Sequence, residues 1–430
     1  MEKTKVLVFP CGSQPAIDIN FSLRYLLRVE VYGASSIEDH GSFIYKKYFG
    51  GIPNISEDNF IEEFNNIISD NKIDFVIPTH DTVSLFLIEN QEFINARIIT
   101  SDLKTNRICR SKKLTYNTFF GCTFTPKIYG DISEVNTYPV FLKPDQGQGG
   151  KGTKLLSNIE ELKYFAAKNR DFLITEYLPG EELTIDCFTD KKGTIRLLSA
   201  RTRERIFGGI SVKSKLTPVT EEITSIAHKI NQELNFRGYW YFQIKRDSEE
   251  IFKLLEISTR MAGTSVLTVS NGINIPLLSI LEFQDLEYEI NANNLLIELE
   301  RALINRYKFN LNYKRVYVDL DDTIIFGNSQ INNYLMMFLY QCINKKQEIV
   351  LITKHSKKVN ETLSEYNICP TIFTRIIHIN QKEYKYHYMD NEVESIFIDN
   401  SFLERKQVKD NLNIPTFDLN NVECLIDWRG

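Results

Sequence analysis

The segment FLKPDQGQGGKGTKLL, residues 141–156, predicts an anion-binding loop between two strands. The first strand ends at Lys143, and a loop with four glycines and Lys151 leads into the next strand. Glycines let backbone N–H groups crowd around phosphate oxygens, and lysines supply positive charge. The segment is not a Walker A loop, because G-K-[ST] at the start of a helix is absent. A flexible β-hairpin loop with solvated lysines is the alternative interpretation.

Two later segments favour the phosphate interpretation. ITEYLPGEELTID, residues 174–186, predicts a strand and a short connector, after which Glu182 can accept hydrogen bonds from a ribose diol. YFQIKRD and LLEISTRMAG place Gln243 and Glu256 on adjacent predicted strands, as a pair of oxygen ligands suited to Mg²⁺ between phosphates. Arg260 follows Glu256 by four residues and is a candidate for contact with a γ-phosphate or an acyl phosphate.

The order of these segments resembles the ATP-grasp superfamily, close to its carbamoyl-phosphate synthase and biotin carboxylase branch. The resemblance covers about the first 290 residues and depends on V-F-L-K-P with the glycine loop, E-Y-L-P-G-E-E and Q-x(12)-E-I-S-T-R. It implies ATP and Mg²⁺ as cofactors. The ATP contacts that it implies are Lys112, Lys143, Gly149, Gly150, Lys151, Glu176, Tyr177, Leu178 and Glu182. The metal ligands that it implies are Gln243, Glu256 and Ser258, the last in place of the usual asparagine.

An ATP-grasp site that holds a carboxylate beside ATP would form an acyl phosphate, which an amine then attacks. Positioning and charge neutralisation supply most of the rate in such a phosphoryl transfer. Arg201, Arg203 and Arg205 in SARTRERIFGG are candidate anchors for a substrate carboxylate or a phosphate, and Arg203 is the favoured catalytic candidate beside Arg260. A small-molecule kinase and an ATP-grasp fold that no longer uses ATP are the alternatives.

A second motif, VDLDDT at residues 318–323, follows a buried β-branched run. Asp319 is expected at the carboxyl end of a strand, where α/β sheets hold their chemistry. Asp319 could attack phosphorus, and Asp321 could protonate the leaving oxygen and then activate water. The alternative interpretation is a pair of side chains that cap a helix after the strand.

This motif resembles the D-x-D-x-T signature of the haloacid dehalogenase (HAD) superfamily, with Thr323 as its last residue. The resemblance covers about residues 314–430, which leave no room for a large cap. It implies Asp319, Asp321, Thr353 and Lys382 as catalytic residues. It also implies Asp319, Asp321 and Asp399 as metal ligands.

Alternating strands and helices predict a combination of α/β and α+β folds. We expect a Rossmann-like pre-ATP-grasp domain at residues 1–109 and an ATP-grasp domain at 110–291. A helical connector at 292–313 would lead to a HAD-like Rossmannoid domain at 314–430 without a large cap.

The net charge of −5 and the scattered basic residues give no support to a nucleic-acid partner. The seven cysteines contain no C-x-x-C pair, and no apolar run approaches a membrane span, so a cytoplasmic protein is expected. The hypothesis is a bifunctional enzyme that ligates a small carboxylate to an amine and removes a phosphate, with a homodimer as one assembly to test. Decoration of bacterial polysaccharides is a setting suggested by analogy alone. A non-catalytic HAD-like module is the alternative for the last domain.

Overall fold

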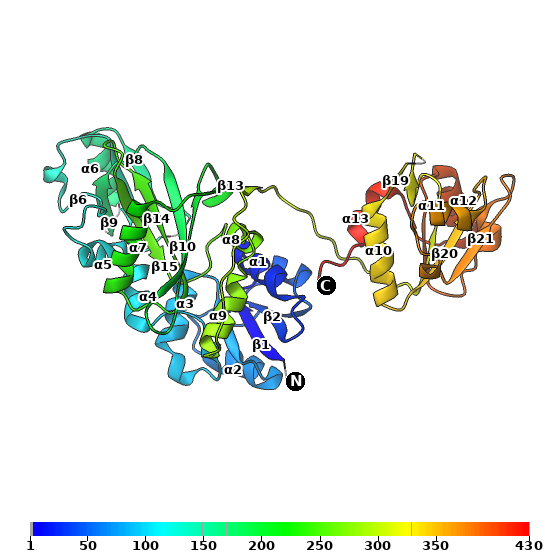
Figure 1. Ribbon diagram of the computed structural model, residues 1–430, viewed down its shortest axis with the longest axis horizontal. Helices are drawn as coiled ribbons and strands as arrows, with labels where there is room; N and C mark the ends of the chain where they lie inside the picture. The colour runs from blue at the N-terminus through cyan, green and yellow to red at the C-terminus, as the bar shows by residue number, and fades with distance from the viewer. Residues whose placement is uncertain (1–2, 148, 169–170, 328, 430) are drawn as a thin grey trace. The chain divides into compact units, whose positions relative to one another are not determined.

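The chain forms two compact units in the computed structural model (Figure 1). The first unit ends at Leu303 and the second comprises Ile304–Arg429, so the division lies inside the segment predicted as a connector. The structure describes residues 3–147, 149–168, 171–327 and 329–429. No helix in these ranges combines the length and the apolar character that crossing a membrane would need.

The first unit begins with a five-stranded parallel sheet in the order β3-β2-β1-β4-β5. Its strands are β1 Thr4–Phe9, β2 Val29–Ser35, β3 Lys47–Gly50, β4 Phe75–Pro78 and β5 Arg97–Ile98. The helices that accompany them are α1 Gln14–Leu23, α2 Phe60–Asn71, α3 Asp81–Glu89 and α4 Leu103–Arg110. The chain order reverses between β1 and β4, so the loops after these two strands meet at a topological switch point.

A four-stranded antiparallel sheet follows in the order β6-β9-β7-β8. Its elements, with the helices beside it, are α5 Lys112–Thr118, β6 Ile128–Tyr129, β7 Val140–Pro144, β8 Lys154–Leu156, α6 Ile159–Lys168 and β9 Phe172–Glu176. The glycine loop therefore connects β7 to β8, two strands that pair directly.

A larger antiparallel sheet has the order β12-β13-β11-β10-β14-β15, with a short strand β16 paired to β13. Its strands are β10 Glu182–Thr189, β11 Ile195–Thr202, β12 Arg205–Phe207, β13 Ile210–Thr217, β14 Gly238–Arg246, β15 Phe252–Ser258 and β16 Glu298–Glu300. The helices are α7 Glu221–Glu233, α8 Val266–Ser270 and α9 Ile275–Phe283. TDKKGT connects β10 to β11 and KRDSEE connects β14 to β15, and each pair of strands is antiparallel.

One face of this sheet is apolar and packs in a core with α7. Ile185 of β10, Phe242 of β14 and Ile226 and Ile230 of α7 belong to the same buried cluster. Successive side chains of a strand point to opposite faces, so residues such as Thr184 and Gln243 lie on the other face. That second face carries the polar side chains of the candidate site.

The prediction of a helical connector at residues 292–313 is wrong. Residues 292–313 hold the short strand β16 and otherwise no regular structure. Leu296 and Leu303 are 96% and 94% exposed, so the apolar stripe has no core to pack on. Most helical stability in proteins comes from the packing of such a stripe, and propensity alone does not replace it.

The second unit is built on another five-stranded parallel sheet, in the order β21-β20-β17-β22-β23. Its strands are β17 Arg315–Val318, β20 Glu348–Thr353, β21 Arg375–His378, β22 Ser395–Ile398 and β23 Thr416–Phe417, with a hairpin of β18 Ile325–Phe326 and β19 Gln330–Ile331. Its helices are α10 Asn333–Asn344, α11 Val359–Glu365, α12 Phe402–Leu412 and α13 Val422–Leu425. The switch point of this sheet lies between β17 and β22, so the loops after these two strands are neighbours.

Candidate functional site

A cavity of about 270 Å³ in the first unit collects most residues of the predicted nucleotide site. It lies between the four-stranded sheet and the polar face of the larger sheet. The predicted residues that line it are Lys112, Lys143, Gly149, Gly150, Lys151, Glu176, Tyr177, Leu178, Glu182, Arg203, Gln243 and Glu256. The structure therefore brings together side chains that are more than a hundred positions apart in the sequence.

Lys143 is a buried cation at the end of β7. Its Nζ donates to the hydroxyl oxygen of Tyr116 at 2.5 Å, and the whole residue is only 5% exposed. Burial and the nearby charge of Lys112 lower the pKa of Lys143 to about 7, against the opposing effect of Glu256. An anion in the cavity would stabilise the ammonium form, which makes Lys143 a natural phosphate contact.

The glycine loop uses the conformational freedom that the sequence predicted. Gly149, Gly150 and Gly152 have φ angles of 57°, 69° and 78°, in a region that residues with a Cβ rarely adopt. The loop also packs against the β12–β13 hairpin, because a Cβ on Gly209 would clash with the backbone of Gly149. The hairpin and the loop therefore hold each other in place at the cavity.

Two of the predicted ATP contacts, Glu176 and Glu182, already have partners within the chain. An oxygen of Glu176 accepts a hydrogen bond from the backbone N–H of Lys127 at 2.6 Å. Glu182 forms ion pairs with Arg203 at 2.6 Å and with Lys245 at 3.6 Å. The Glu182 carboxylate is thus fixed at the cavity wall by two cations.

The predicted metal pair is part of a row of residues that crosses four strands. Glu256 of β15 is opposite Gln243 of β14, Gln243 is opposite Thr184 of β10, and Thr184 is opposite Arg201 of β11. Directly opposed residues share a face of the sheet, so all four belong to the polar floor. With its amide group turned so that both ends are paired, Gln243 donates to Glu256 at 3.3 Å and accepts from Arg203 at 3.0 Å.

A second cavity, of about 620 Å³, shares Gln243, Glu256 and Arg203 with the first. It extends to the switch point of the first sheet, where Ser13 and Thr79 line it. The other basic residues among its lining are Arg110, Lys151, Arg201 and Arg260. These positive charges make the second cavity favourable for an anionic ligand.

Two predicted site residues, Ser258 and Arg260, share Asp81 as a partner. The Ser258 hydroxyl donates to Oδ1 of Asp81 at 2.5 Å and lines neither cavity, so it is not placed as a metal ligand. Arg260 lines the second cavity but is tied to Asp81 by hydrogen bonds of 2.8 and 3.0 Å. Asp81 was missed, because its partners come from a segment about 180 positions away.

The remaining arginine candidates have separate environments. Arg201 is fully buried and pairs with Asp186, also fully buried. Arg205 is exposed and pairs with Glu300 outside the two cavities. Of the three arginines in SARTRERIFGG, Arg203 is the one that lines both cavities.

Comparison with known proteins gives the first unit its context. A family model described as "ATP-grasp in the biosynthetic pathway with Ter operon" matches residues 168–311. The carbamoyl-phosphate synthase of Methanobrevibacter smithii is 26% identical over 148 residues, which are 32% of this chain and 40% of that protein. The chain thus spans less than half the length of this relative.

Solved structures show the same architecture. The biotin carboxylase domain of the Hydrogenobacter thermophilus 2-oxoglutarate carboxylase, in complex with MgADP, ADP and bicarbonate, aligns with a TM-score of 0.55 at 18% identity, over 67% of this chain and 72% of that chain. The L-amino acid ligase from Bacillus licheniformis aligns with a TM-score of 0.53 at 16% identity, over 66% and 74% of the two chains. The chain contains an ATP-grasp fold.

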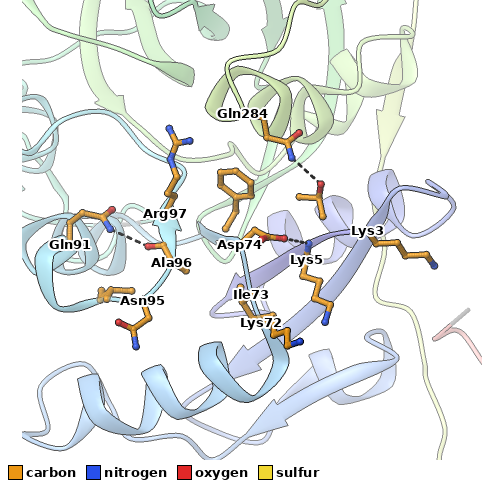
Figure 2. A pocket seen from close by; sticks show the side chains of 13 residues that line it. Lys3, Lys5, Lys72, Ile73, Asp74, Gln91, Asn95, Ala96, Arg97 and Gln284 are labelled. Atoms are coloured by element: carbon orange, nitrogen blue, oxygen red, sulfur yellow. Dashed lines mark hydrogen bonds between the residues drawn. The ribbon is translucent and has the colours of Figure 1, made fainter. Parts of the chain in front are cut away.

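The ATP-grasp unit also has a cavity on the opposite edge of its first sheet. Figure 2 shows this hollow of about 760 Å³, with Lys3, Lys5, Lys72 and Arg97 around it. It lies at the amino ends of β1 and β4, where the backbone N–H of Lys5 donates to Asp74 at 2.8 Å. The cavities of the candidate nucleotide site lie at the carboxyl edge, so this hollow is separate from them.

The second unit gathers a buried charged cluster at its own switch point. Asp319 follows β17 and Asp399 follows β22, and Nζ of Lys385 lies 2.6 Å from a carboxylate oxygen of each. Burial raises the pKa of Asp319, although Lys385 opposes the effect, and the pKa of Lys385 is itself raised by its two acidic partners against the opposing effect of burial. The prediction of Lys382 as the catalytic lysine is wrong, because Lys382 is exposed and Lys385 lies in the cluster instead.

The other predicted residues of this unit surround the cluster. Asp321 is held by His355, whose Nδ1 lies 2.7 Å from its oxygen, and the Thr323 hydroxyl lies 3.3 Å from Asp319. Thr353 is fully buried, and among the described residues its hydroxyl has no hydrogen-bond partner. In the same described part, no three His, Cys, Asp or Glu side chains are arranged as a metal site. Asp321 is drawn to His355, so the predicted ligand trio with Asp319 and Asp399 is not assembled.

Proposed function

We propose that the ATP-grasp unit is an ATP- and Mg²⁺-dependent ligase that joins a small carboxylate to an amine through an acyl phosphate. The observation that carries the proposal is the convergence of Lys143, Glu182, Gln243 and Glu256 on one cavity. A second cavity with the same Gln243 and Glu256 in its wall supplies room for the acceptor. The similarity to ligases and carboxylases of the same fold supports this class of reaction.

ATP and Mg²⁺ are supported as cofactors by relatives of this fold in complex with MgADP. The residues fit these groups, since a buried lysine with a lowered pKa needs an anion and positive-φ glycines form a loop beside it. Glu176, Tyr177 and Leu178 would lie along the adenine, and Glu182 would reach the ribose. Lys112, Lys143, Lys151 and the glycine loop would contact the phosphates. Gln243 and Glu256 would hold Mg²⁺, which would neutralise part of the negative charge of the phosphates.

The reaction has two steps in which the chain positions charged groups. A carboxylate oxygen of the acceptor attacks the γ-phosphorus of ATP, the bond to the β,γ-bridging oxygen breaks, and ADP leaves. The amine then attacks the acyl carbon, orthophosphate leaves and the amine loses a proton. Lys143 and Arg203 stabilise negative charge that shifts between these oxygens, and pre-positioned charges of this kind supply most of the acceleration in phosphoryl transfer.

We further propose that the second unit is a HAD-like phosphohydrolase. Its support is the cluster at the switch point, where Asp319, Asp399 and Lys385 meet and the buried Thr353 hydroxyl has no partner among the described residues. Asp319 would attack phosphorus, Asp321 would act as acid and base, and Thr353 and Lys385 would hold the phosphoryl oxygens. Asp319 and Asp399 would hold Mg²⁺, which offsets the charge of the phosphoryl group when bound. Both units would act on small-molecule substrates, and we propose the cytoplasm as their location.

A release assay tests both proposals on the full-length chain. We expect ADP from ATP only when a carboxylate and an amine are both supplied from a panel of amino acids and sugar acids. The mass of the product distinguishes an amide from a phosphorylated acceptor, and the latter would make the unit a kinase. With small phosphoesters and Mg²⁺, Asp319→Asn should lose phosphatase turnover and keep ADP formation. Loss of both activities would contradict separate sites, and persistent phosphatase silence would favour a non-catalytic second unit.

A further inference from the structure

Two buried polar groups in the floor of the second cavity have unused hydrogen-bonding capacity. Thr184 is 1% exposed and Arg201 is fully buried, and both line this cavity and not the smaller nucleotide cavity. Within the described residues, neither the Thr184 hydroxyl nor Nη2 of Arg201 has a hydrogen-bond partner. Buried polar groups in native proteins are nearly always paired, so two neighbouring exceptions at one cavity call for an explanation.

The rest of the Arg201 side chain is held rigidly. Its Nε donates to the Thr264 hydroxyl at 2.7 Å, and its Nη1 pairs with Asp186. Asp186 is fixed in turn by Thr268, whose hydroxyl donates to it at 2.7 Å. These contacts, together with the nearby Tyr239 hydroxyl, fix the plane of the guanidinium, and Nη2 is left, among the described residues, with a free N–H group that can donate to an acceptor in the cavity.

Thr184 and Arg201 are also next to the reacting groups. Thr184 lies between Gln243 and Arg201 in the row of directly opposed residues, and Gln243 is opposite Glu256. A ligand bound at Thr184 and Arg201 would thus lie one strand away from the proposed Mg²⁺ ligands, on the same face of the sheet. This is the side of the floor that faces the second cavity, where an acceptor has room.

We infer that Thr184 and Arg201 bind a carboxylate oxygen of the acceptor substrate and thereby select an acid over a neutral compound. The inference rests on the proposed ligase function and adds the residues that recognise the acceptor. The Thr184 hydroxyl and Nη2 of Arg201 would both donate to the oxygen, which satisfies the two unpaired groups at once. Thr184 and Arg201 bind the substrate in this proposal, and Lys143 and Glu182 do not take part in that contact.

Thr184→Val gives the sharpest test, because valine has nearly the same shape and lacks the hydroxyl. The full-length chain is first screened, with amines present, for the acid that stimulates ADP release, and that acid is then titrated against each variant at a fixed amine concentration. We expect Thr184→Val to raise the KM for this acid about tenfold, the loss that a hydrogen bond to a charged group produces. The KM for ATP should stay unchanged, and Thr184→Ser should restore the KM for the acid.

Thr224→Val is the matched control, since it removes a hydroxyl from α7 that bonds only within the helix, to Thr220. Arg201→Lys is a second variant, expected to weaken the acid in the same way; if it does not fold, Thr184→Val decides alone. An unchanged KM for the acid in Thr184→Val would overturn the inference and leave the ligase proposal standing. If no acid stimulates ADP release in the unaltered chain, the ligase proposal and this inference both fail.

Discussion

Nε and Nη2 of Arg260 both donate to Oδ2 of Asp81, at 3.0 and 2.8 Å, although the residues are 179 positions apart. Asp81 is the first residue of α3, the helix that follows β4 of the parallel sheet. Arg260 follows β15, the last long strand of the antiparallel sheet. The Ser258 hydroxyl donates to the other oxygen of Asp81. The contact therefore fixes the second cavity by tying its two walls together.

Asp81→Asn should lower the free energy of unfolding by about 3 kcal/mol at pH 7, because it leaves Arg260 without its counter-charge in a mostly buried place. Burial would raise the pKa of Asp81, but Arg260 and Ser258 together lower it below the ordinary 3.8. The stabilisation is therefore present above pH 3.8 and is lost as the pH falls through the lowered pKa. Urea unfolding of both proteins across this range measures the difference. Asp70→Asn, an exposed change on α2, is the control, and an equal effect of the two variants would contradict the prediction.

Gly209→Ala should weaken nucleotide binding about tenfold, because the new Cβ would clash with the backbone of Gly149 and displace the glycine loop. Gly208→Ala is the matched control on the same hairpin. Both glycines have positive φ angles, 58° at Gly208 and 81° at Gly209, but a Cβ on Gly208 would meet nothing within 4 Å. Titration with a fluorescent ADP analogue measures the dissociation constants. Similar losses in both variants would assign the effect to backbone strain rather than to the loop contact.

Lys143 should take up a proton when a nucleotide binds at pH 8. Burial and Lys112 lower the pKa of this lysine to about 7, so it is mostly neutral at pH 8 in the free protein. Phosphate oxygens favour the ammonium form and raise that pKa on binding. Calorimetric titration with ADP in two buffers of different ionisation enthalpy measures the uptake. It should be absent in Lys143→Met, and equal uptake in the two proteins would assign the proton to another group.

Lys385→Met should destabilise the second unit by about 3–5 kcal/mol and abolish phosphatase turnover, because it leaves Asp319 and Asp399 buried without a cation. The three side chains are 3%, 7% and 0% exposed for Lys385, Asp319 and Asp399, so solvent offers little compensation. Lys382→Met, three positions earlier and exposed, should change neither quantity. Circular dichroism in urea and phosphoester hydrolysis give the two readouts. A stable Lys385→Met protein with full turnover would refute the role of the cluster.

Local sequence was informative wherever a short segment carries its own chemistry. The glycine loop needed positive φ angles, and only glycine supplies them without strain, so the loop was predictable from composition. Lys143 and the Gln243–Glu256 pair followed from strands whose alternation fixes which side chains share a face. Asp319 followed from its expected place at the carboxyl end of a strand, and Asp399 was implied by the resemblance to the HAD superfamily.

Other features were decided by contacts between segments far apart in the chain. Whether Ser258 binds a metal or Asp81, and whether Lys382 or Lys385 enters the acidic cluster, depends on which partners the fold brings within reach. The apolar spacing of 292–313 was compatible with a helix, but no core lies beside it. Sequence determined the local backbone and the available chemical groups. Tertiary structure decided their partners, because burial, charge pairing and helix stability depend on neighbours that local spacing does not specify.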